Sequence, residues 1–176
     1  TIEHAKEIMQ ALDPSIKKTA VVVKPSIKQI RQIEAAGFDY IQIHGMIDPA
    51  LFSQIRLPIL KAFNVKDMDT IADYRLDKNV AGYVFDAHEP GSGKSFDWSM
   101  LSDIPRDNKL FFLAGGISAD NVKEAIKKLS PDGIDVSTGV EYNASNKTGK
   151  DPQKIEEFVR IIRTEQKTYN RFSFYK

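Results

Sequence analysis

Cysteine is absent from the 176 residues, and histidine is scarce, with only three copies. Without cysteine the chain has no disulfide bonds and no thiolate ligands for a metal, a composition that fits a reducing compartment. The histidines are His4, His44 and His88, and their spacing matches no metal-ligand pattern. We therefore expect neither a metal centre nor a disulfide framework.

Long apolar runs and an excess of charge of one sign are missing too. No run approaches the roughly 18 residues of a membrane-spanning helix, and the opening TIEHAKEIMQ is too polar for a signal peptide. The net charge is +1, so charge predicts neither nucleic-acid nor membrane binding. We expect a cytoplasmic protein with a small-molecule partner. The length and the 41% apolar content predict one domain over 1–176, with a polar and aromatic tail at 164–176.

Short apolar runs rich in β-branched residues predict buried parallel strands. These runs are 19–23, 40–44, 59–63, 82–86, 110–114 and 133–137. Apolar residues at helical spacing lie around them. The predicted helices are an opening one with Ala5, Ile8, Met9 and Leu12 on one face, one at 25–36 closed by Gly37, shorter ones near 48–54 and 66–74, one from a Ser118 N-cap through Leu129, and one after Asp151 and Pro152.

The regular alternation of strand and helix predicts a parallel sheet with helical crossovers. Two architectures fit this pattern, an open doubly wound sheet and a closed (β/α)8 barrel. Six strand–helix units are too few for a closed barrel of eight, and the chain opens on a helix with no strand before it. Either the sheet is open, or the chain begins part-way into a barrel.

The stretch GSGKS at 91–95 suggests a nucleotide-binding P-loop. That motif requires G-x-x-x-x-G-K-[ST], with a helix starting at the lysine. GKS at 93–95 fits its end, but His88 stands where the first glycine is required, and the next residues predict a helix capped at Asp97. A nucleotide-hydrolysing P-loop is therefore disfavoured.

Two glycine-containing turns predict an anion site at the carboxyl ends of the strands. Gly115 and Gly116 precede a predicted helix, and Ser137, Thr138 and Gly139 follow the last predicted strand. Such turns expose backbone N–H groups, and a helix N-terminus adds partial positive charge. In barrels the loops after strands seven and eight form a phosphate site of this kind. The alternative is that these glycines only make tight turns.

Three further polar residues lie at or near strand ends. Asp86 ends a predicted strand, where a carboxylate suits proton transfer, or it caps the following turn. His44 either contacts a substrate or hydrogen-bonds to a backbone carbonyl. Asp135, out of phase with its apolar neighbours in the last strand, either holds a polar ligand group or bonds a neighbouring backbone N–H.

Taken together, several motifs resemble the phosphoribosylanthranilate isomerase family of tryptophan biosynthesis. They are IQIHG at 41–45, VFDA at 84–87 with GSGKSFDW at 91–98, FLAGGIS at 112–118 followed by Asn121 and Val122, and DVSTGVE at 135–141 with GKD at 149–151. Each motif alone is weak, but their order and spacing match over essentially Thr1 to about Arg163. The resemblance implies a TIM barrel, here incomplete, with an opening helix followed by six βα units.

The resemblance also implies an activity and its residues. The family converts N-(5-phosphoribosyl)anthranilate to 1-(o-carboxyphenylamino)-1-deoxyribulose 5-phosphate by an Amadori rearrangement, without cofactor or metal, and its members include monomers and homodimers. The implied residues are Asp86 as general acid, His44, Gly91, Gly93 and Asp135 as substrate contacts, and Gly115, Gly116, Ser137, Thr138 and Gly139 as the phosphate site. The glycines at 91 and 93 would form a mobile cover over the substrate.

The sequence departs from the family pattern at its start. The family's opening strand carries Lys-Ile-Cys-Gly, with the cysteine as general base. Thr1–Ala5 aligns with the family's second helix, so the first strand, first helix and second strand are expected to be missing from this sequence. One hypothesis is a full isomerase whose intact mass exceeds 19.8 kDa. The alternatives are a shortened non-catalytic paralogue that binds a sugar phosphate, and another sugar-phosphate barrel enzyme of tryptophan or histidine biosynthesis.

Overall fold

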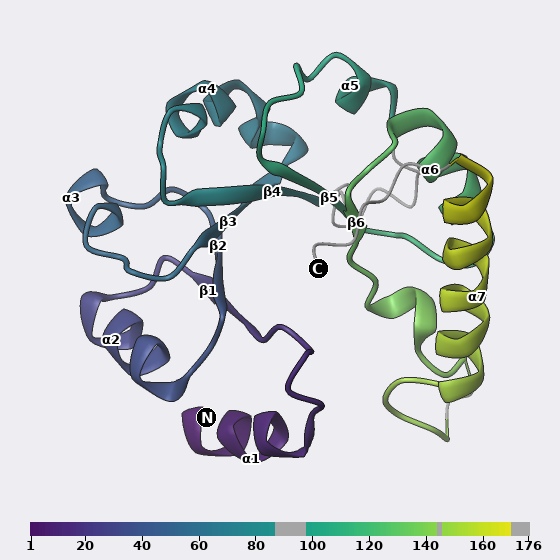
Figure 1. The fold of residues 1–176 in the computed structure, drawn as a ribbon, viewed down its shortest axis with the longest axis horizontal. Helices are drawn as coiled ribbons and strands as arrows, with labels where there is room; N and C mark the ends of the chain where they lie inside the picture. The colour runs from purple at the N-terminus through teal and green to yellow at the C-terminus, as the bar shows by residue number, and fades with distance from the viewer. Residues whose placement is uncertain (87–97, 144–145, 170–176) are drawn as a thin grey trace. The chain divides into compact units, whose positions relative to one another are not determined.

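The computed structural model describes residues 1–86, 98–143 and 146–169. They belong to two compact units, Thr1–Val84 and Phe85–Lys176. The strand order in the sheet follows the chain, from β1 to β6, and helices alternate with the strands (Figure 1). This alternation confirms the predicted α/β class with parallel strands.

Three strands of the first unit pair in parallel, namely β1 (Thr19–Val23), β2 (Tyr40–His44) and β3 (Ile59–Asn64). The register sets Ile41 opposite both Ala20 and Ile59, and all three are buried. The β-branched runs therefore form strands because their side chains meet in one apolar layer. The next strand, β4 (Val80–Asp86), begins in the first unit and ends in the second.

The helices of the first unit are α1 (Ile2–Ala11), α2 (Ile27–Ala36), α3 (Pro49–Phe52) and α4 (Ile71–Arg75), and the 3₁₀ helix η1 (Val65–Thr70) precedes α4. The ends of α2 follow from local chemistry. Ser26 and Gln29 form a reciprocal capping box at its start, and Gly37 ends it at φ 88°, a left-handed conformation that glycine adopts without strain.

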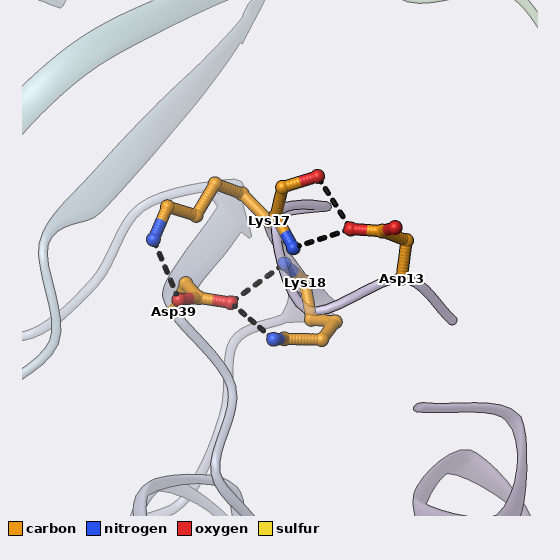
Figure 2. A network of polar contacts seen from close by, with 5 residues as sticks. Asp13, Lys17, Lys18 and Asp39 are labelled. Atoms are coloured by element: carbon orange, nitrogen blue, oxygen red, sulfur yellow. Dashed lines mark hydrogen bonds and ion pairs between the residues drawn. The ribbon is translucent and has the colours of Figure 1, made fainter. Parts of the chain in front are cut away.

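A polar cluster joins the segment before β1 to the start of β2 (Figure 2). The Asp39 carboxylate accepts a hydrogen bond from the Lys18 backbone N–H at 2.9 Å and forms ion pairs with the Lys17 and Lys18 ammonium groups. The Lys18 carbonyl in turn accepts from the Asp39 N–H at 2.8 Å. The Lys18 backbone bond, opposed by partial desolvation and aided by the two lysines, lowers the pKa of Asp39 to about 2.

An aromatic cluster in the first unit encloses a lysine. Phe63 packs against Tyr74 at 5.6 Å and Tyr83 at 5.9 Å between ring centroids. The ammonium of Lys61 lies 4.4 Å from the Phe63 ring centre and 5.1 Å from that of Tyr74, and it donates to the Ala62 carbonyl at 2.6 Å. Lys61 is 2% exposed, and desolvation lowers its pKa to about 8 although Asp67 opposes the shift.

The second unit contains α5 (Ser99–Ser102), β5 (Leu110–Ala114), α6 (Val122–Leu129), β6 (Gly133–Ile134), the 3₁₀ helix η2 (Thr138–Val140) and α7 (Pro152–Tyr169). Helices α6 and α7 lie side by side (Figure 1). The apolar stripe of α6 is buried, as predicted. Arg106 covers the end of α6, with its guanidinium over the Phe111 ring and bonded to the Leu129 and Ser130 carbonyls.

The structure corrects two predicted boundaries in this unit. The last strand ends at Ile134 rather than at 137, because the chain turns at Ser137 into η2. The regular helix α6 begins at Val122, with Asn121 as its cap residue, so it starts later than the predicted Ser118 cap implies. Ser118 nevertheless contacts the start of the helix, because its carbonyl accepts from the Val122 N–H at 3.0 Å and its hydroxyl accepts from the Asp120 N–H at 3.3 Å. The Asn121 amide accepts from the Ser118 N–H at 2.9 Å and donates to the Gly116 carbonyl at 2.8 Å.

The remaining predictions either agree with the structure or concern residues that it does not describe. The predicted Asp151 cap is confirmed by a bond from the Gln153 N–H to its carboxylate at 3.0 Å. Helix α5 follows Trp98, and the cap predicted at Asp97 lies outside the described residues, as do the GSGKS stretch and 170–176. Within the described ranges no helix is long and apolar enough to cross a membrane.

Candidate active site

The two predicted phosphate turns meet in the second unit. A Cβ atom on Gly139 would overlap the Ile117 carbonyl and would lie 3.0 Å from the Ser118 Cα, so Gly139 lies directly against the backbone of the first turn. Only glycine allows two main chains to approach this closely. The turn after β5 and the turn after β6 are therefore one continuous surface.

The first turn depends on two consecutive glycines. Gly115 and Gly116 have φ values of 78° and 64°, a left-handed pair that side-chain-bearing residues adopt only with strain. The Asn121 side chain closes this turn by bonding the Gly116 carbonyl. Successive left-handed or turn residues orient backbone N–H groups into concavities that bind anions.

The second turn is held by a lysine from farther along the chain. The Ser137 carbonyl accepts from the Val140 N–H at 3.3 Å and from the Lys150 ammonium at 3.0 Å. The same ammonium bonds the Ser137 hydroxyl at 2.9 Å and the Glu141 carboxylate at 2.7 Å. Ser137 and Thr138 are exposed, so their hydroxyls are accessible to a ligand.

Asp86 is the last residue of β4 and is half-buried. Its neighbour Phe85 packs on Phe111 of β5, with ring centroids 4.6 Å apart. The carboxyl end of β4 is thereby anchored beside the strand that leads into the Gly115 turn. A carboxylate at a strand end is well placed for proton transfer to a bound ligand.

Asp135 lies just beyond β6 rather than inside the strand, and it is exposed. Its backbone N–H still donates to the Leu113 carbonyl at 2.8 Å. The backbone therefore continues the pairing of β5 with β6, and Asp135 lies at the edge where the turn after β6 begins.

His44 ends β2 in the first unit and is half-buried. Its Nε2 lies 3.0 Å from the Gln42 amide nitrogen. Because an amide nitrogen only donates, Nε2 accepts in this contact and the neutral ring carries its proton on Nδ1. The Gln42 side chain is thus one partner of the ring.

The predicted substrate contacts Gly91 and Gly93 lie outside the described residues. Among the residues that the structure does describe, no group of three His, Cys, Asp or Glu side chains could hold a metal ion.

Comparison with known proteins adds the decisive observation. The family model for N-(5'-phosphoribosyl)anthranilate (PRA) isomerase matches residues 1–161. The chain belongs to the PRA isomerase family.

Curated relatives agree with this PRA isomerase assignment. The N-(5'-phosphoribosyl)anthranilate isomerase of Streptococcus gordonii is 37% identical over 168 residues, which cover 93% of this chain and 80% of that protein. The isomerase of Syntrophomonas wolfei is 38% identical over 166 residues, covering 92% and 79%. The chain therefore spans about 80% of the length of these relatives.

Solved structures show the same fold. Phosphoribosylanthranilate isomerase from Thermotoga maritima superposes with a TM-score of 0.78 at 29% identity, covering 93% of this chain and 81% of that one. TrpF from Jonesia denitrificans gives 0.74 at 29% identity, covering 94% and 80%. A third structure is an isomerase in complex with reduced 1-(o-carboxyphenylamino)-1-deoxyribulose 5-phosphate, with a TM-score of 0.73, 26% identity, and coverage of 93% and 80%. The predicted TIM-barrel family fold is confirmed.

Three side chains of this PRA isomerase were given no role from the sequence. Gln42 contacts His44, Asn121 closes the glycine turn after β5, and Lys150 holds the turn after β6. Asn121 and Lys150 lie within motifs that carry the family resemblance, but neither periodicity nor local spacing reveals their partners. Only the folded chain brings Lys150 to Ser137.

Proposed function

We propose that this protein catalyses the Amadori rearrangement of N-(5-phosphoribosyl)anthranilate to 1-(o-carboxyphenylamino)-1-deoxyribulose 5-phosphate in tryptophan biosynthesis. One observation carries the proposal: in a PRA isomerase family member, Gly139 lies against the Ile117–Ser118 backbone and joins the two glycine turns. The substrate is a phosphate ester, and this joined surface has the backbone N–H groups and hydroxyls that suit its phosphate.

The phosphate contacts would come from both turns. They are Gly115, Gly116, Ser137, Thr138 and Gly139. With the phosphate held there, the ribose would extend toward the ends of the neighbouring strands, as in other barrels with a phosphate site at this edge. Asp135 and His44 are the proposed contacts to the rest of the substrate, and Gly91 and Gly93 remain predicted contacts.

Asp86 would act as the general acid. It gives its proton to the ribose ring oxygen as the bond from that oxygen to C1 breaks, which opens the ring to a Schiff base. A general base then removes the proton from C2 to give the enolamine, which tautomerises to the ketone. The base is not a cysteine of these 176 residues, because they contain none. No cofactor or metal takes part in these steps.

The test follows the fluorescence of N-(5-phosphoribosyl)anthranilate mixed with the protein purified at its natural length. We expect loss of the anthranilate-type fluorescence as the rearranged product forms. An intact mass above 19.8 kDa would accompany activity if the natural protein is a full isomerase. No turnover by that protein would overturn the proposal.

A second candidate, a sugar-phosphate-binding paralogue without catalysis, would need the same joined surface of the two glycine turns but no general base. The same preparation distinguishes the two. Binding of reduced 1-(o-carboxyphenylamino)-1-deoxyribulose 5-phosphate without turnover of substrate supports the paralogue. Binding together with turnover supports the isomerase.

As for assembly, we propose a monomer or a homodimer. The Thermotoga maritima isomerase, described as dimeric and solved in monomeric form, superposes with a TM-score of 0.73. Sedimentation of the purified protein measures the state directly.

A further inference from the structure

Lys150 contacts the proposed phosphate site without having been assigned to it. Its ammonium lies within hydrogen-bond distance of three oxygens: the Ser137 carbonyl at 3.0 Å, the Ser137 hydroxyl at 2.9 Å and the Glu141 carboxylate at 2.7 Å. An ammonium has three N–H donors and no acceptor. The three oxygens match these donors, so the donors of Lys150 are used by contacts within the chain.

Backbone pairing places Lys150 next to Ser137. Glu141 and Lys150 form an antiparallel bridge, with the Tyr142 N–H bonded to the Gly149 carbonyl and the Asp151 N–H to the Val140 carbonyl. The bridge closes the loop that follows η2. Lys150 therefore approaches Ser137 from a braced backbone although 13 positions separate them in sequence.

The contact determines what the Ser137 hydroxyl can do. A hydroxyl has one hydrogen to donate and two lone pairs to accept. Since the ammonium donates to the Ser137 oxygen, the hydroxyl hydrogen stays available for an acceptor elsewhere, and a hydroxyl polarised by a cation is a stronger donor. Ser137 is exposed, and Gly139 of the same turn lies against the Gly115–Ser118 turn.

We propose that Lys150 is a positioning residue of the phosphate site, which holds both oxygens of Ser137 so that the Ser137 hydroxyl donates to the ligand's phosphate. The inference rests on the proposed function, because it takes the ligand to be a sugar phosphate. It adds a cation that acts on the phosphate through one serine.

The test measures binding by calorimetry with two probes on the 176-residue chain. The probes are reduced 1-(o-carboxyphenylamino)-1-deoxyribulose 5-phosphate and the same compound without its phosphate. Lys150→Met is expected to weaken the phosphorylated probe about 10-fold, the range for a hydrogen bond to a charged group, and to leave the dephosphorylated probe within about 2-fold. Equal weakening of both probes, or weakening of neither, would overturn the proposal.

Coupling to Ser137 is the sharper measurement. Ser137→Ala is expected to weaken the phosphorylated probe about as much as Lys150→Met, and the double variant no more than either single one. Fully additive losses would show that Lys150 acts independently of Ser137 and would refute the positioning role. Lys154→Met is the matched control, because Lys154 bonds the Glu141 carbonyl and the Asn143 side chain.

The absence of cysteine allows a chemical rescue. Lys150→Cys creates a unique thiol in this chain, and aminoethylation of that thiol restores an ammonium of nearly the original length. Restored phosphate-dependent binding supports the proposal, and unrestored binding with native thermal unfolding contradicts it. Lys150→Gln replaces Lys150→Met if the latter does not fold.

The outcomes also separate this inference from the proposed activity. Phosphate-dependent binding by the 176-residue chain, together with no turnover by the natural-length protein, would overturn the activity and leave the role of Lys150 standing. No binding of either probe by the unmodified chain would overturn the phosphate site and this inference together.

Discussion

Two lysines, Lys61 in the first unit and Lys150 in the second, have opposite surroundings. Lys61 of the first unit is 2% exposed among aromatic rings, with one carbonyl at 2.6 Å. Lys150 of the second unit is exposed and lies among three oxygens. The apolar surroundings of Lys61 oppose its charge, whereas the oxygens around Lys150 use its charge to orient a turn. The comparison shows that a buried lysine is opposed by its surroundings, whereas an exposed lysine among oxygens orients a turn.

The largest expected effect tests whether catalysis depends on the second unit. Asp86→Asn keeps the size of the side chain but removes the transferable proton, so we predict a fall in turnover of about 10²–10⁴-fold, the range for a lost general acid. Fluorescence of N-(5-phosphoribosyl)anthranilate measures it in the natural-length protein.

The control for Asp86 is binding. The reduced phosphate analogue should bind Asp86→Asn within about 2-fold of the unmodified protein, since the phosphate turns are untouched. Asp103→Asn, at an exposed position of the same unit, should retain full turnover. Unchanged turnover in Asp86→Asn would refute its role as the acid.

The next effect concerns the contact that joins the phosphate turns. Gly139→Ala places a Cβ against the Ile117 carbonyl, and the backbones must separate, which typically costs about 1–3 kcal/mol. We expect lower stability in urea and loss of phosphate-analogue binding together. Gly37→Ala is the control, because Gly37 has φ +88° but nothing within 4 Å of the added atom. It should lose stability but keep binding, and if both variants kept binding, the contact would not shape the site.

These residues show what the sequence could and could not predict. Strands 19–23, 40–44 and 110–114 were predicted at their observed bounds, because short apolar runs need burial wherever they lie. The start of α6 lies later than predicted, although the Ser118–Asn121 bond before it is local. The end of the last strand was wrong, because Ser137 follows a side-chain bond to Lys150, 13 positions away, that forms only in the fold. Lys150 was missed for the same reason.

Unlike the strands, the roles of the site residues are not tested by the structure. Family membership supports the predicted activity, but the roles of Asp86, His44, Asp135 and the phosphate turns stay predictions. The burial of Lys61 could not be foreseen, because a lysine within ILKAFN gives no sign that Tyr74, from a later helix, closes over it.

A smaller effect tests the buried charge of the first unit. The pKa of Lys61 is about 8 in the fold against 10.5 ordinarily, so the unfolded chain binds more protons between these pH values and stability should rise with pH across that window. Lys61→Met removes the buried charge. We expect it to raise the free energy of unfolding at pH 7 by about 1–2 kcal/mol and to abolish that rise.

Urea unfolding at pH 7 and pH 9.5 measures the Lys61 effect. Lys78→Met, at an exposed position, is the control and should leave the pH dependence as it is. If Lys61→Met lowered stability at both pH values by the same amount, the packing of the Lys61 methylene chain on the aromatic rings would outweigh the cost of its buried charge. Burial would then not oppose Lys61, and the contrast with Lys150 would be wrong.

The smallest effect comes from a charge of the first unit that is stabilised by polar contacts, as Lys150 is. The pKa of Asp39 is lowered from 3.8 to about 2, first by the Lys18 backbone N–H. Its stabilising contribution is therefore present above pH 3.8 and is lost as the pH falls toward 2. Because the ion pairs are partly exposed, Asp39→Asn should lower the free energy of unfolding at pH 6 by less than about 1 kcal/mol.

The pH dependence of the Asp39→Asn effect shows whether Asp39 stabilises the fold through its charge or through its hydrogen-bond geometry. Urea unfolding of Asp39→Asn should differ from that of the parent at pH 6, and the difference should shrink as the pH falls toward 2, the pKa at which the parent carboxylate becomes half protonated in the fold. Asp69→Asn, at an exposed position in η1, should show no such change. A difference as large at pH 2 as at pH 6 would mean that Asp39 contributes through hydrogen-bond geometry alone, because an asparagine keeps one acceptor for the Lys18 N–H but loses the second carboxylate oxygen. In that case Asp39 in the first unit and Lys150 in the second would both act by orienting the backbone through hydrogen bonds. Lys61 would then be the residue on which the contrast between the two units depends.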